Sequence, residues 1–349
     1  MTDRLQLSAI VHLGSDTGRS LERAVALEQA GIDVISIAEA YGVDAVSLLG
    51  YVAAKTTTAR LMSAIMPLYS RTPTLIAMTA AGLDLISGGR FMLGLGASGP
   101  QVIEGWHGVP YDAPLGRTRE TIEICRSVWK RERVEYAGKH YTLPLPPEKG
   151  TGLGKPLKLI THPYRSDIPI FLAALGEKNV ELTAEMAQGW IPFLFVPELA
   201  DRVWGAALDR GGRTRDAALG PLQVVAGAPL AIGPDTARLR DAERPHIALY
   251  VGGMGARGKN FYNDVAARYG FEAEAKLIQD LYLEGKREQA EAAVPQALID
   301  GMSLIGEEAY IKDRLAAYRD AGVTMIQIDP IGPDPIGDVR RLRELLDSV

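Results

Sequence analysis

An almost uninterrupted apolar run, Ile168-Pro169-Ile170-Phe171-Leu172-Ala173-Ala174, is followed after a short turn by the amphipathic segment 178–188. Apolar runs of this length are typical of strands that are covered on both faces, as they are in parallel sheets. The amphipathic segment that follows has the spacing of a helix with one buried face. This part of the chain therefore predicts a strand–helix unit of a parallel α/β fold.

The same order of a short apolar run and a longer amphipathic one recurs along the chain and predicts eight strand–helix units. The expected strands are Leu5–Val11, Val34–Ile37, Arg60–Met66, Arg90–Leu95, Ile168–Ala173, Trp190–Phe195, Leu222–Ala228 and Val323–Ile328. The expected helices are Arg19–Ala30, Asp44–Lys55, Pro73–Ile86, Leu115–Arg131, Lys178–Gln188, Glu198–Asp209 and Ile336–Leu346, with more helix after the seventh strand. Eight units favour one (β/α)8 barrel over residues 1–349, and a doubly wound open sheet is the alternative.

Two stretches exceed what a minimal barrel needs, and we expect them as insertions after the fourth and seventh strands. The first, at about 132–167, contains a hairpin pattern at 134–141 and a segment rich in Pro and Gly. The second, at about 233–305, is largely amphipathic and contains the basic loop 252–259. Long insertions after barrel strands usually lie near the active face, so both are candidate site segments.

The composition is that of an ordinary globular protein. Of the 349 residues, 47% are apolar and 23% are charged, which excludes disorder as the main state. The single cysteine, Cys125, excludes a disulfide scaffold and is expected to be inert packing on a helix. The net charge of −5 gives no overall basic field for nucleic acid. No run reaches the roughly 20 apolar residues that span a bilayer, and no signal-peptide pattern is seen, so the cytoplasm is the expected compartment.

The pattern G-x-G-x-x-G of dinucleotide-binding folds occurs at Gly94-Leu95-Gly96-Ala97-Ser98-Gly99. In those folds the motif follows the first strand and opens a long βαβ unit. Here it follows the fourth expected strand, and a turn-like segment comes next. We therefore favour a backbone approach to another planar cofactor or phosphate. A plain tight turn is one alternative, and a Rossmann site for NAD(P) is the least favoured.

A second candidate cofactor contact is the turn after the fifth strand, where Gly176 and Lys178 precede a helix. The first N–H groups of a helix are free and carry a positive partial charge, so anions bind there. Gly176 would permit a close approach, and Lys178 would add a full charge. An ordinary turn between strand and helix is the alternative.

Polar residues also follow the first and second strands, at the rim where barrel enzymes carry catalysis. His12 could relay a proton near neutral pH, with a hydrogen-bonded rim residue as the alternative for both His12 and Glu39. Trp106 and His107 come just after the Gly-rich turn and could line a pocket or pack structurally. The five histidines show no metal-ligand spacing, so no metal site is predicted.

Segments 35–41, 63–73 and 88–108 together resemble the luciferase-like superfamily of flavin and deazaflavin enzymes. Within it, the sequence is similar to the coenzyme F420-dependent oxidoreductases of actinobacterial type. The block Ser87–Gly108 is the most specific part, and the loop Gly255–Tyr269 resembles the same branch. The resemblance spans nearly the whole chain and implies a barrel of bacterial-luciferase type, in agreement with the strand count.

This resemblance implies that coenzyme F420, a deazaflavin, lies at the carboxyl rim of the barrel. In relatives a cis peptide without proline underlies the ring, and the matching bond here is Ser63–Ala64. The implied contacts near the ring are Ser63, Ala64, Ile65, Gly96, Ala97, Ser98 and Gln101. The implied contacts at the phosphate are Ala174, Leu175, Gly176, Lys178 and Asn179. Lys178, Arg257 or Lys259 would meet the carboxylates of the coenzyme's glutamyl tail.

Departures from two related branches narrow the expected reaction. In the glucose-6-phosphate dehydrogenase branch a His follows the acid after strand two and a Glu follows the Gly-rich turn, whereas Ala40 and Gly99 stand here. The methylene-tetrahydromethanopterin reductase branch carries an acid on strand one, and residues 6–12 include none. The first departure excludes sugar-phosphate oxidation, and the second counts against the pterin reaction.

The resulting expectation is hydride transfer between C5 of F420 and an organic substrate bound over the exposed ring face. His12 is the expected proton donor, supported by Glu39. The expected pocket of a small to medium, partly apolar substrate comprises Tyr41, Tyr69, Trp106 and His107. A homodimer is expected, with no nucleic-acid or membrane partner. The alternatives are an FMN-dependent monooxygenase served by a flavin reductase, a non-catalytic deazaflavin-binding protein and an NAD(P) dehydrogenase.

Overall fold

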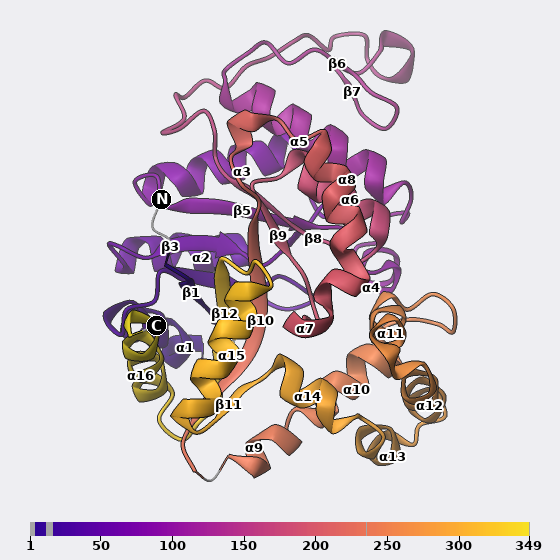
Figure 1. Cartoon of the computed structure of the whole chain (residues 1–349). Helices are drawn as coiled ribbons and strands as arrows, with labels where there is room; N and C mark the ends of the chain where they lie inside the picture. Colours follow the sequence, from indigo (N-terminus) through magenta and orange to yellow (C-terminus); the bar gives the residue numbers. More distant parts are fainter. Residues whose placement is uncertain (1–3, 12–16, 235, 349) are drawn as a thin grey trace.

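The computed structural model describes residues 4–11, 17–234 and 236–348. Within them, parallel strands close into a ring in which the last strand is hydrogen bonded to the first (Figure 1). The barrel strands are β1 (Gln6–Ile10), β2 (Val34–Ile37), β3 (Arg60–Ser63), β5 (Phe91–Gly96), β8 (Ile170–Ala173), β9 (Gly189–Ile191), β10 (Gln223–Ile232) and β12 (Met325–Pro330). The pairings β1–β12 and β9–β10 complete the ring, so the predicted barrel is confirmed and the open sheet is wrong.

Two short strands extend the barrel wall. β4 (Met66–Pro67) continues beside β5 after a break in the expected strand Arg60–Met66. β11 (Leu304–Gly306) pairs with the carboxyl half of β10. The sequence pattern did not predict β11 because three residues are too few to show a period.

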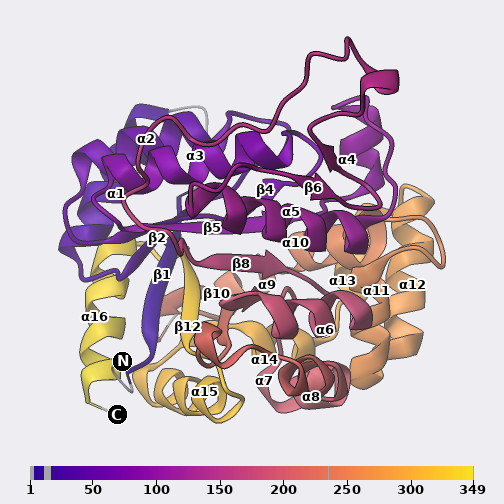
Figure 2. The same ribbon diagram turned by 90° about the horizontal axis from the view of Figure 1, so that it is seen from above.

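The helices that follow the strands cover the outside of the barrel (Figure 2). They are α1 (Thr17–Gln29), α2 (Ala45–Lys55), α3 (Pro73–Ile86), α4 (Pro100–Gly105), α5 (Pro114–Trp129), α6 (Glu177–Met186), α7 (Pro197–Ala200), η2 (Asp201–Gly205), α8 (Ala206–Arg213), η3 (Ala217–Leu219), α15 (Glu308–Asp320) and α16 (Pro335–Asp347). Local sequence sets their starts: the Asp44 carboxylate accepts from the Ser47 N–H at 2.9 Å. Thr72 caps α3, and Pro73 occupies its first turn, as predicted.

Both expected insertions contain structure of their own. The first holds the antiparallel pair β6 (Tyr136–Ala137) and β7 (Thr142–Leu143) and the turn η1 (Pro147–Lys149). The second gathers on one side of the barrel in Figure 1 as α9 (Ala237–Asp241), α10 (Arg244–Ala248), η4 (Leu249–Gly253), α11 (Phe261–Ala266), η5 (Ala267–Phe271), α12 (Glu272–Leu283), α13 (Arg287–Ala292) and α14 (Gln296–Met302). Of the helices in the described ranges, none is long and apolar enough to cross a membrane.

Candidate active site

The inward-facing side chains of the strands close the barrel interior at one level, which we call the floor. The open end of the barrel above it, where the strands have their carboxyl ends, is called the mouth. The floor is one apolar layer inside the ring, made of Val34, Met62, Met92, Phe171, Val225 and Met325. Because side chains alternate along a strand, Gln327 and Asp329 also point inward, toward the carboxyl end. Both are partly exposed, whereas Ile326 and Ile328 between them are buried against the helices. Even Gly227, in the middle of β10, is exposed. The barrel is therefore open at the end that carries chemistry in this fold.

At one side of this mouth, the Gly-rich strand β5 lies directly against the end of β3. The Ser63 hydroxyl donates to the Gly94 carbonyl oxygen at 2.9 Å and accepts from the Gly94 N–H at 3.0 Å. A Cβ on Gly94 would lie 1.7 Å from the Ser63 carbonyl oxygen, and one on Gly96 would lie 2.7 Å from Ile65 Cδ1. The structure thus brings together Ser63, Ile65 and Gly96 of the predicted ring contacts. The glycines serve this close approach between two strands of a barrel, so the Rossmann interpretation does not fit.

The predicted position of the cis peptide was wrong by one residue, because the cis bond that lacks proline joins Ala64 to Ile65. Ser63 still pairs with Ile37 in the β2–β3 register, and the Ala64 N–H donates to the Ile37 carbonyl at 2.8 Å. The Ser63–Ala64 peptide is therefore part of the regular ladder, and the strand breaks only after it.

The turn that follows β5 leads to other predicted ring contacts. Ser98 has a positive φ of 58°, and its carbonyl accepts from the Tyr111 hydroxyl at 3.3 Å. Ala97 is half-buried before it, and Gln101 is exposed on α4. The segment after the Gly-rich turn, which the sequence predicted to be turn-like, forms this six-residue helix in part. Ala97, Ser98 and Gln101 are therefore close together in sequence just after β5. Ala97 is half-buried, and Ser98 and Gln101 are exposed to solvent.

The predicted phosphate contacts lie in the turn between β8 and α6. Two indole N–H groups fix this turn: Trp190 donates to the Ala174 carbonyl at 2.9 Å, and Trp204 donates to the Leu175 carbonyl at 3.0 Å. Gly176 is the N-cap residue of α6, and no side chain there accepts a hydrogen bond from the first N–H groups of the helix. The first N–H groups of α6 are therefore offered at the barrel rim, where an anion would be stabilised.

Glu39 has a firm structural role at the rim. Its carboxylate is only 7% exposed and accepts from both terminal nitrogens of Arg71, at 2.5 and 3.0 Å. The Ala45 N–H at the start of α2 donates to Glu39 Oε2 at 2.9 Å. Glu39 therefore joins the loops after β2 and β4. His12 lies outside the described residues, so its pairing with Glu39 stays a prediction.

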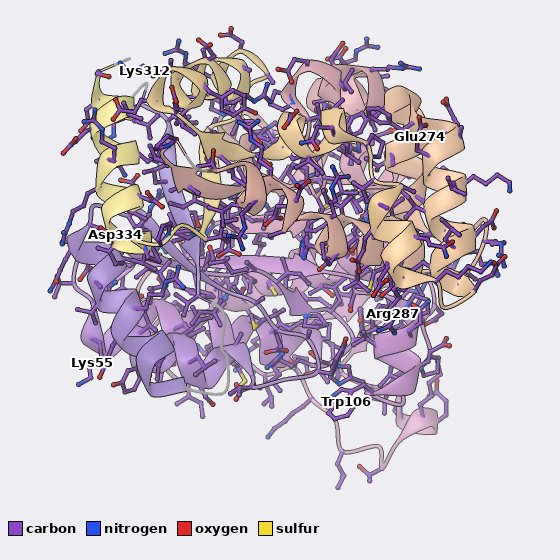
Figure 3. All side chains as sticks on the ribbon, turned by 90° about the horizontal axis from the view of Figure 1, so that it is seen from below. Lys55, Trp106, Glu274, Arg287, Lys312 and Asp334 are labelled. Atoms are coloured by element: carbon purple, nitrogen blue, oxygen red, sulfur yellow. The ribbon has the colours of Figure 1, made fainter. Side chains whose placement is uncertain are left out.

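Two of the four predicted pocket residues meet at the mouth. The rings of Tyr41 and Trp106 lie 6.5 Å apart and are 65% and 66% exposed; Figure 3 shows Trp106 at the periphery of the molecule. Tyr69 is instead buried, and its hydroxyl donates to the Asp112 carbonyl at 2.7 Å. His107 Nε2 is buried and has no hydrogen-bond partner among the described residues. Tyr41 and Trp106 thus form an exposed aromatic pair, and Tyr69 supports the rim from below.

Comparison with known proteins identifies this arrangement. A model of the family described as luciferase-like monooxygenase matches residues 5–325. The chain belongs to the luciferase-like monooxygenase family. The resemblance stated from the sequence is therefore confirmed.

This luciferase-like chain is 41% identical over 328 residues to a protein of Mycobacterium tuberculosis provisionally named a coenzyme F420-dependent oxidoreductase, in a match that covers 92% of this chain and 93% of that one. It is 30% identical over 318 residues to a 5,10-methylenetetrahydromethanopterin reductase of Archaeoglobus fulgidus, over 88% of each chain. The structure of the coenzyme F420-dependent tetrahydromethanopterin reductase from Methanopyrus kandleri superposes with a TM-score of 0.78 at 22% identity, covering 97% of this chain and 96% of that one. That likeness is one of fold.

A further aromatic group of the luciferase-like chain was missed from the sequence. Phe193, just beyond β9, lies 4.3 Å from the ring of Tyr250 and 5.4 Å from that of Tyr262, both in the second insertion. Burial raises the pKa of Tyr250, and the nearby Tyr41 hydroxyl adds to the effect. The insertion therefore reaches the Tyr41 side of the mouth. In the sequence Phe193 fell within the expected strand Trp190–Phe195, whereas β9 ends at Ile191, and nothing local paired it with residues more than 50 positions away.

The same insertion brings the predicted tail contacts to the phosphate turn. A Cβ on Gly176 would lie 3.5 Å from Phe261 Cε1, so the start of α11 is adjacent to the start of α6. Lys178 and Lys259 are exposed, and each is close in sequence to the start of one of these two helices. Arg257 is also exposed but forms an ion pair with Asp280 at 2.8 Å. Of the three predicted cations, Arg257 is therefore already engaged.

Other chemistry has little support at this site. In the described ranges, no group of three or more His, Cys, Asp or Glu side chains could hold a metal ion. Cys125 is fully buried on α5, and burial raises the pKa of its thiol. A thiol held in its neutral form far from the mouth is a packing group rather than a nucleophile.

Proposed function

We propose that this protein is an oxidoreductase that uses coenzyme F420 and transfers a hydride between the coenzyme and an organic substrate. The observation that carries this proposal is the 41% identity, over 92% of the chain, to a protein provisionally named for that activity. Bound F420 would supply the hydride chemistry itself. The chain's own residues would hold the coenzyme, orient the substrate and keep water from the reacting atoms.

The mouth fits such a coenzyme in two respects. Gln327 Oε1 is buried at the inward face of β12 and has no hydrogen-bond partner in the part of the chain described, so it could accept from a bound N–H group. Gly227 pairs with Gln327 in the β10–β12 register, and Ala64 and Gly96 are further small residues at the ends of β3 and β5. A planar ring would meet these small residues, and an anionic group would meet the start of α6.

The substrate that we propose is small to medium in size and partly apolar. Its support is the exposed pair of Tyr41 and Trp106, together with the aromatic contact between Phe193 and Tyr250. Aromatic rings give a large contact area for apolar groups, and the tyrosine hydroxyls and indole N–H give a few oriented polar contacts. The same residues would exclude water once a substrate is bound.

The FMN-dependent monooxygenase remains the second candidate, since the matching family model is described by that activity. A non-catalytic deazaflavin carrier is the third. FMN lacks a glutamyl tail, so the exposed Lys178 and Lys259 would contribute less to its binding. The three candidates differ in which cofactor binds and in whether turnover follows.

A fluorescence-quench titration of the purified protein with F420 and, in parallel, with FMN tests the proposal. We expect a dissociation constant in the micromolar range or below for F420, and at least about tenfold weaker binding of FMN, which corresponds to roughly 1.4 kcal/mol. Preferred FMN binding would instead support the monooxygenase. Tight F420 binding without turnover of any ketone or enone supplied with the reduced coenzyme would support the carrier.

The fit at Gln327 gives a second expected result. Gln327→Ala should weaken F420 binding by about two- to tenfold, because one hydrogen bond contributes roughly 0.5–1.5 kcal/mol. Gln289→Ala, on exposed α13, is the matched control and should leave the titration unchanged. Equal affinities for the two variants would mean that the coenzyme does not use the Gln327 amide.

We also propose the homodimer that the resemblance implies, with a cytoplasmic location as an accompanying expectation. Its support is an apolar surface on α2 and α3, formed by the exposed residues Tyr51, Leu75, Met78, Leu85 and Ile86. Light scattering should give twice the chain mass, and the double substitution Met78→Glu with Ile86→Glu should halve it. Leu277→Glu, at a half-exposed position of α12, is the control. A monomeric wild-type protein would overturn the proposal.

A further inference from the structure

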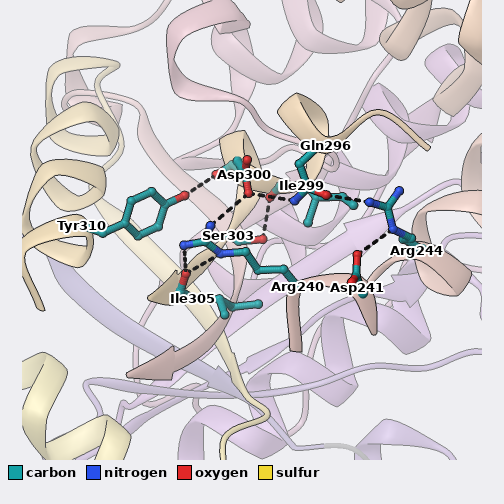
Figure 4. A network of polar contacts seen from close by, with 9 residues as sticks. All are labelled: Arg240, Asp241, Arg244, Gln296, Ile299, Asp300, Ser303, Ile305 and Tyr310. Atoms are coloured by element: carbon teal, nitrogen blue, oxygen red, sulfur yellow. Dashed lines mark hydrogen bonds and ion pairs between the residues drawn. The ribbon is translucent and has the colours of Figure 1, made fainter. Parts of the chain in front are cut away.

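The second insertion is fixed at its root by a network of polar contacts around the start of α10 (Figure 4). Arg240 donates from Nε and Nη2 to the Ile305 carbonyl of β11, at 2.8 and 2.6 Å. Arg244, the first residue of α10, donates to the Val294 carbonyl and to Gln296 Oε1, both at 2.6 Å. The start of α10 is therefore attached to α14, and the helix before it is attached to β11.

The other end of this helical segment, η4, is held by the side chain of Asn260, which is the residue before α11. Asn260 is only 1% exposed, and its Nδ2 donates to the carbonyl oxygens of Tyr250 and Val251, both at 3.0 Å. Its Oδ1 accepts from the N–H groups of Tyr262 and Asn263, at 3.0 and 3.2 Å. An amide side chain has two N–H donors and an oxygen that accepts two bonds. Every hydrogen-bonding position of Asn260 is therefore used to join η4 to α11.

The loop 254–260 between these two helical ends is folded tightly on itself. A Cβ on Gly255 would lie 2.6 Å from the Lys259 carbonyl oxygen, and the Lys259 N–H donates to the Ala256 carbonyl at 2.9 Å. The Gly255 carbonyl accepts from Gln279 Nε2 of α12 at 3.3 Å. The loop is therefore packed against itself and against α12, and Asn260 stands where its two ends meet.

Two aromatic residues depend on this junction for their positions. The rings of Tyr250 and Tyr262 lie 4.9 Å apart, and they lie 4.3 and 5.4 Å from the ring of Phe193, just beyond the carboxyl end of β9. We call these three rings the aromatic wall. Each of the three residues is half-buried, so part of the wall is accessible. Because Asn260 bonds the backbone of both tyrosines, it fixes their positions relative to each other.

We propose that Asn260 is a positioning residue that holds the aromatic wall in the arrangement that receives the apolar part of the substrate. The inference rests on the proposed oxidoreductase function, in which an organic substrate binds at the mouth. Asn260 is buried and acts through Tyr250 and Tyr262. A wall that is already ordered binds more tightly, because side chains that must be fixed during binding reduce the affinity. The proposed coenzyme contacts on β3, on β5 and before α6 make none of the four Asn260 bonds, so coenzyme binding should not depend on it.

Asn260→Ser separates the two halves of this junction. The substitution removes both amide donors but leaves a hydroxyl, which is a preferred helix cap and can accept from the Tyr262 N–H. Asn260→Asp, which keeps the shape of the side chain and both acceptor contacts, is the second variant. Asn263→Ser is the matched control, because the Asn263 amide also donates to two carbonyls, those of Val251 and Ala275, at 3.0 and 2.7 Å. Neither of these carbonyls belongs to a residue of the aromatic wall.

Hydrogen exchange of the protein without coenzyme tests whether Asn260 holds the wall. The backbone amides of 249–253 should exchange at least about tenfold faster in Asn260→Ser and in Asn260→Asp than in the wild type, because η4 loses its attachment to α11. Exchange at the wild-type rate in a folded variant would overturn the inference. This measurement requires neither coenzyme nor substrate.

Reduction of cyclic ketones and enones with the reduced coenzyme tests the effect on the substrate. We expect Asn260→Ser to raise KM by about tenfold, which is the order of the cost of fixing one or two side chains on binding. Its kcat should change by less than about threefold and its F420 dissociation constant by less than about twofold, since neither depends on the wall. Asn263→Ser should keep the wild-type KM. An equal rise of KM in Asn260→Ser and Asn263→Ser would mean general loosening of the insertion and would overturn the inference.

A double-mutant cycle shows whether Asn260 acts through the wall. Tyr250→Ala should raise KM by itself, and adding Asn260→Ser to it should raise KM by less than about twofold more, because the two changes affect the same ring. Fully additive effects would show that Asn260 acts elsewhere. A wild type that binds F420 yet reduces no probe would count against the proposed function, whereas hydrogen exchange would still decide whether Asn260 holds the wall.

Discussion

Gly94→Ala should leave little or no folded protein. The added Cβ would lie 1.7 Å from the Ser63 carbonyl oxygen, which is backbone and cannot rotate away. Both strands are also fixed by their neighbours, since Met62 pairs with Met92 and Leu93 pairs with Ile170. Relieving the overlap requires β3 and β5 to separate and the two hydrogen bonds between Ser63 and Gly94 to break. We expect a loss above about 4 kcal/mol, a large share of a typical 5–15 kcal/mol of stability.

Soluble yield and thermal unfolding measure this effect, with Gly212→Ala as the matched control. Gly212 is exposed near the end of α8, and a Cβ there would meet nothing within 4 Å. The same substitution should therefore stabilise the protein by up to about 0.5–1 kcal/mol, because Gly loses more backbone entropy in a helix than Ala does. A Gly94→Ala protein with a wild-type melting temperature would show that the strands can move apart at little cost. The contact would then not explain why Gly stands there.

The Gly94 contact also shows how far the sequence could be interpreted. The alternating runs predicted the barrel strands because a strand buried on both faces must be apolar nearly throughout, as 168–174 is. Asp44 and Pro73 marked helix starts because their effect is local. The Gly-rich turn was correctly separated from a dinucleotide site by its place in the chain, but the need for Gly94 comes from Ser63, 31 residues away. Only the fold brings these two residues together.

The residues that the sequence did not reveal are likewise brought together only by the fold. Phe193 and Tyr250 meet because η4 folds back over the end of β9, and no periodicity links a loop with a helix so far along the chain. Glu39 lies at the rim, and its pairing with Arg71 makes it a link between two loops that the sequence did not predict, while its support of His12 stays a prediction.

Arg71→Ala should destabilise the protein strongly and weaken coenzyme binding. The side chains of Arg71 and Glu39 are only 14% and 7% exposed, so the substitution leaves a buried carboxylate without its cation. Breaking a buried pair in this way costs about 3–5 kcal/mol, whereas an exposed pair contributes at most about 1 kcal/mol. Arg341→Ala is the exposed control, since Arg341 and its partner Glu308 are 44% and 45% exposed. Chemical denaturation compares the two variants directly.

The double substitution Glu39→Gln with Arg71→Met separates charge from position. Removing both charges should restore most of the stability, because no buried charge is left uncompensated. The amide oxygen introduced by Glu39→Gln would still accept from the Ala45 N–H and so keep the start of α2 in place. If F420 binding returns with stability, the pair acts by fixing the loops after β2 and β4, which carry the exposed Tyr41 and the buried Tyr69. If the double variant is stable but binds the coenzyme weakly, the charges of Glu39 and Arg71 themselves contribute to the site.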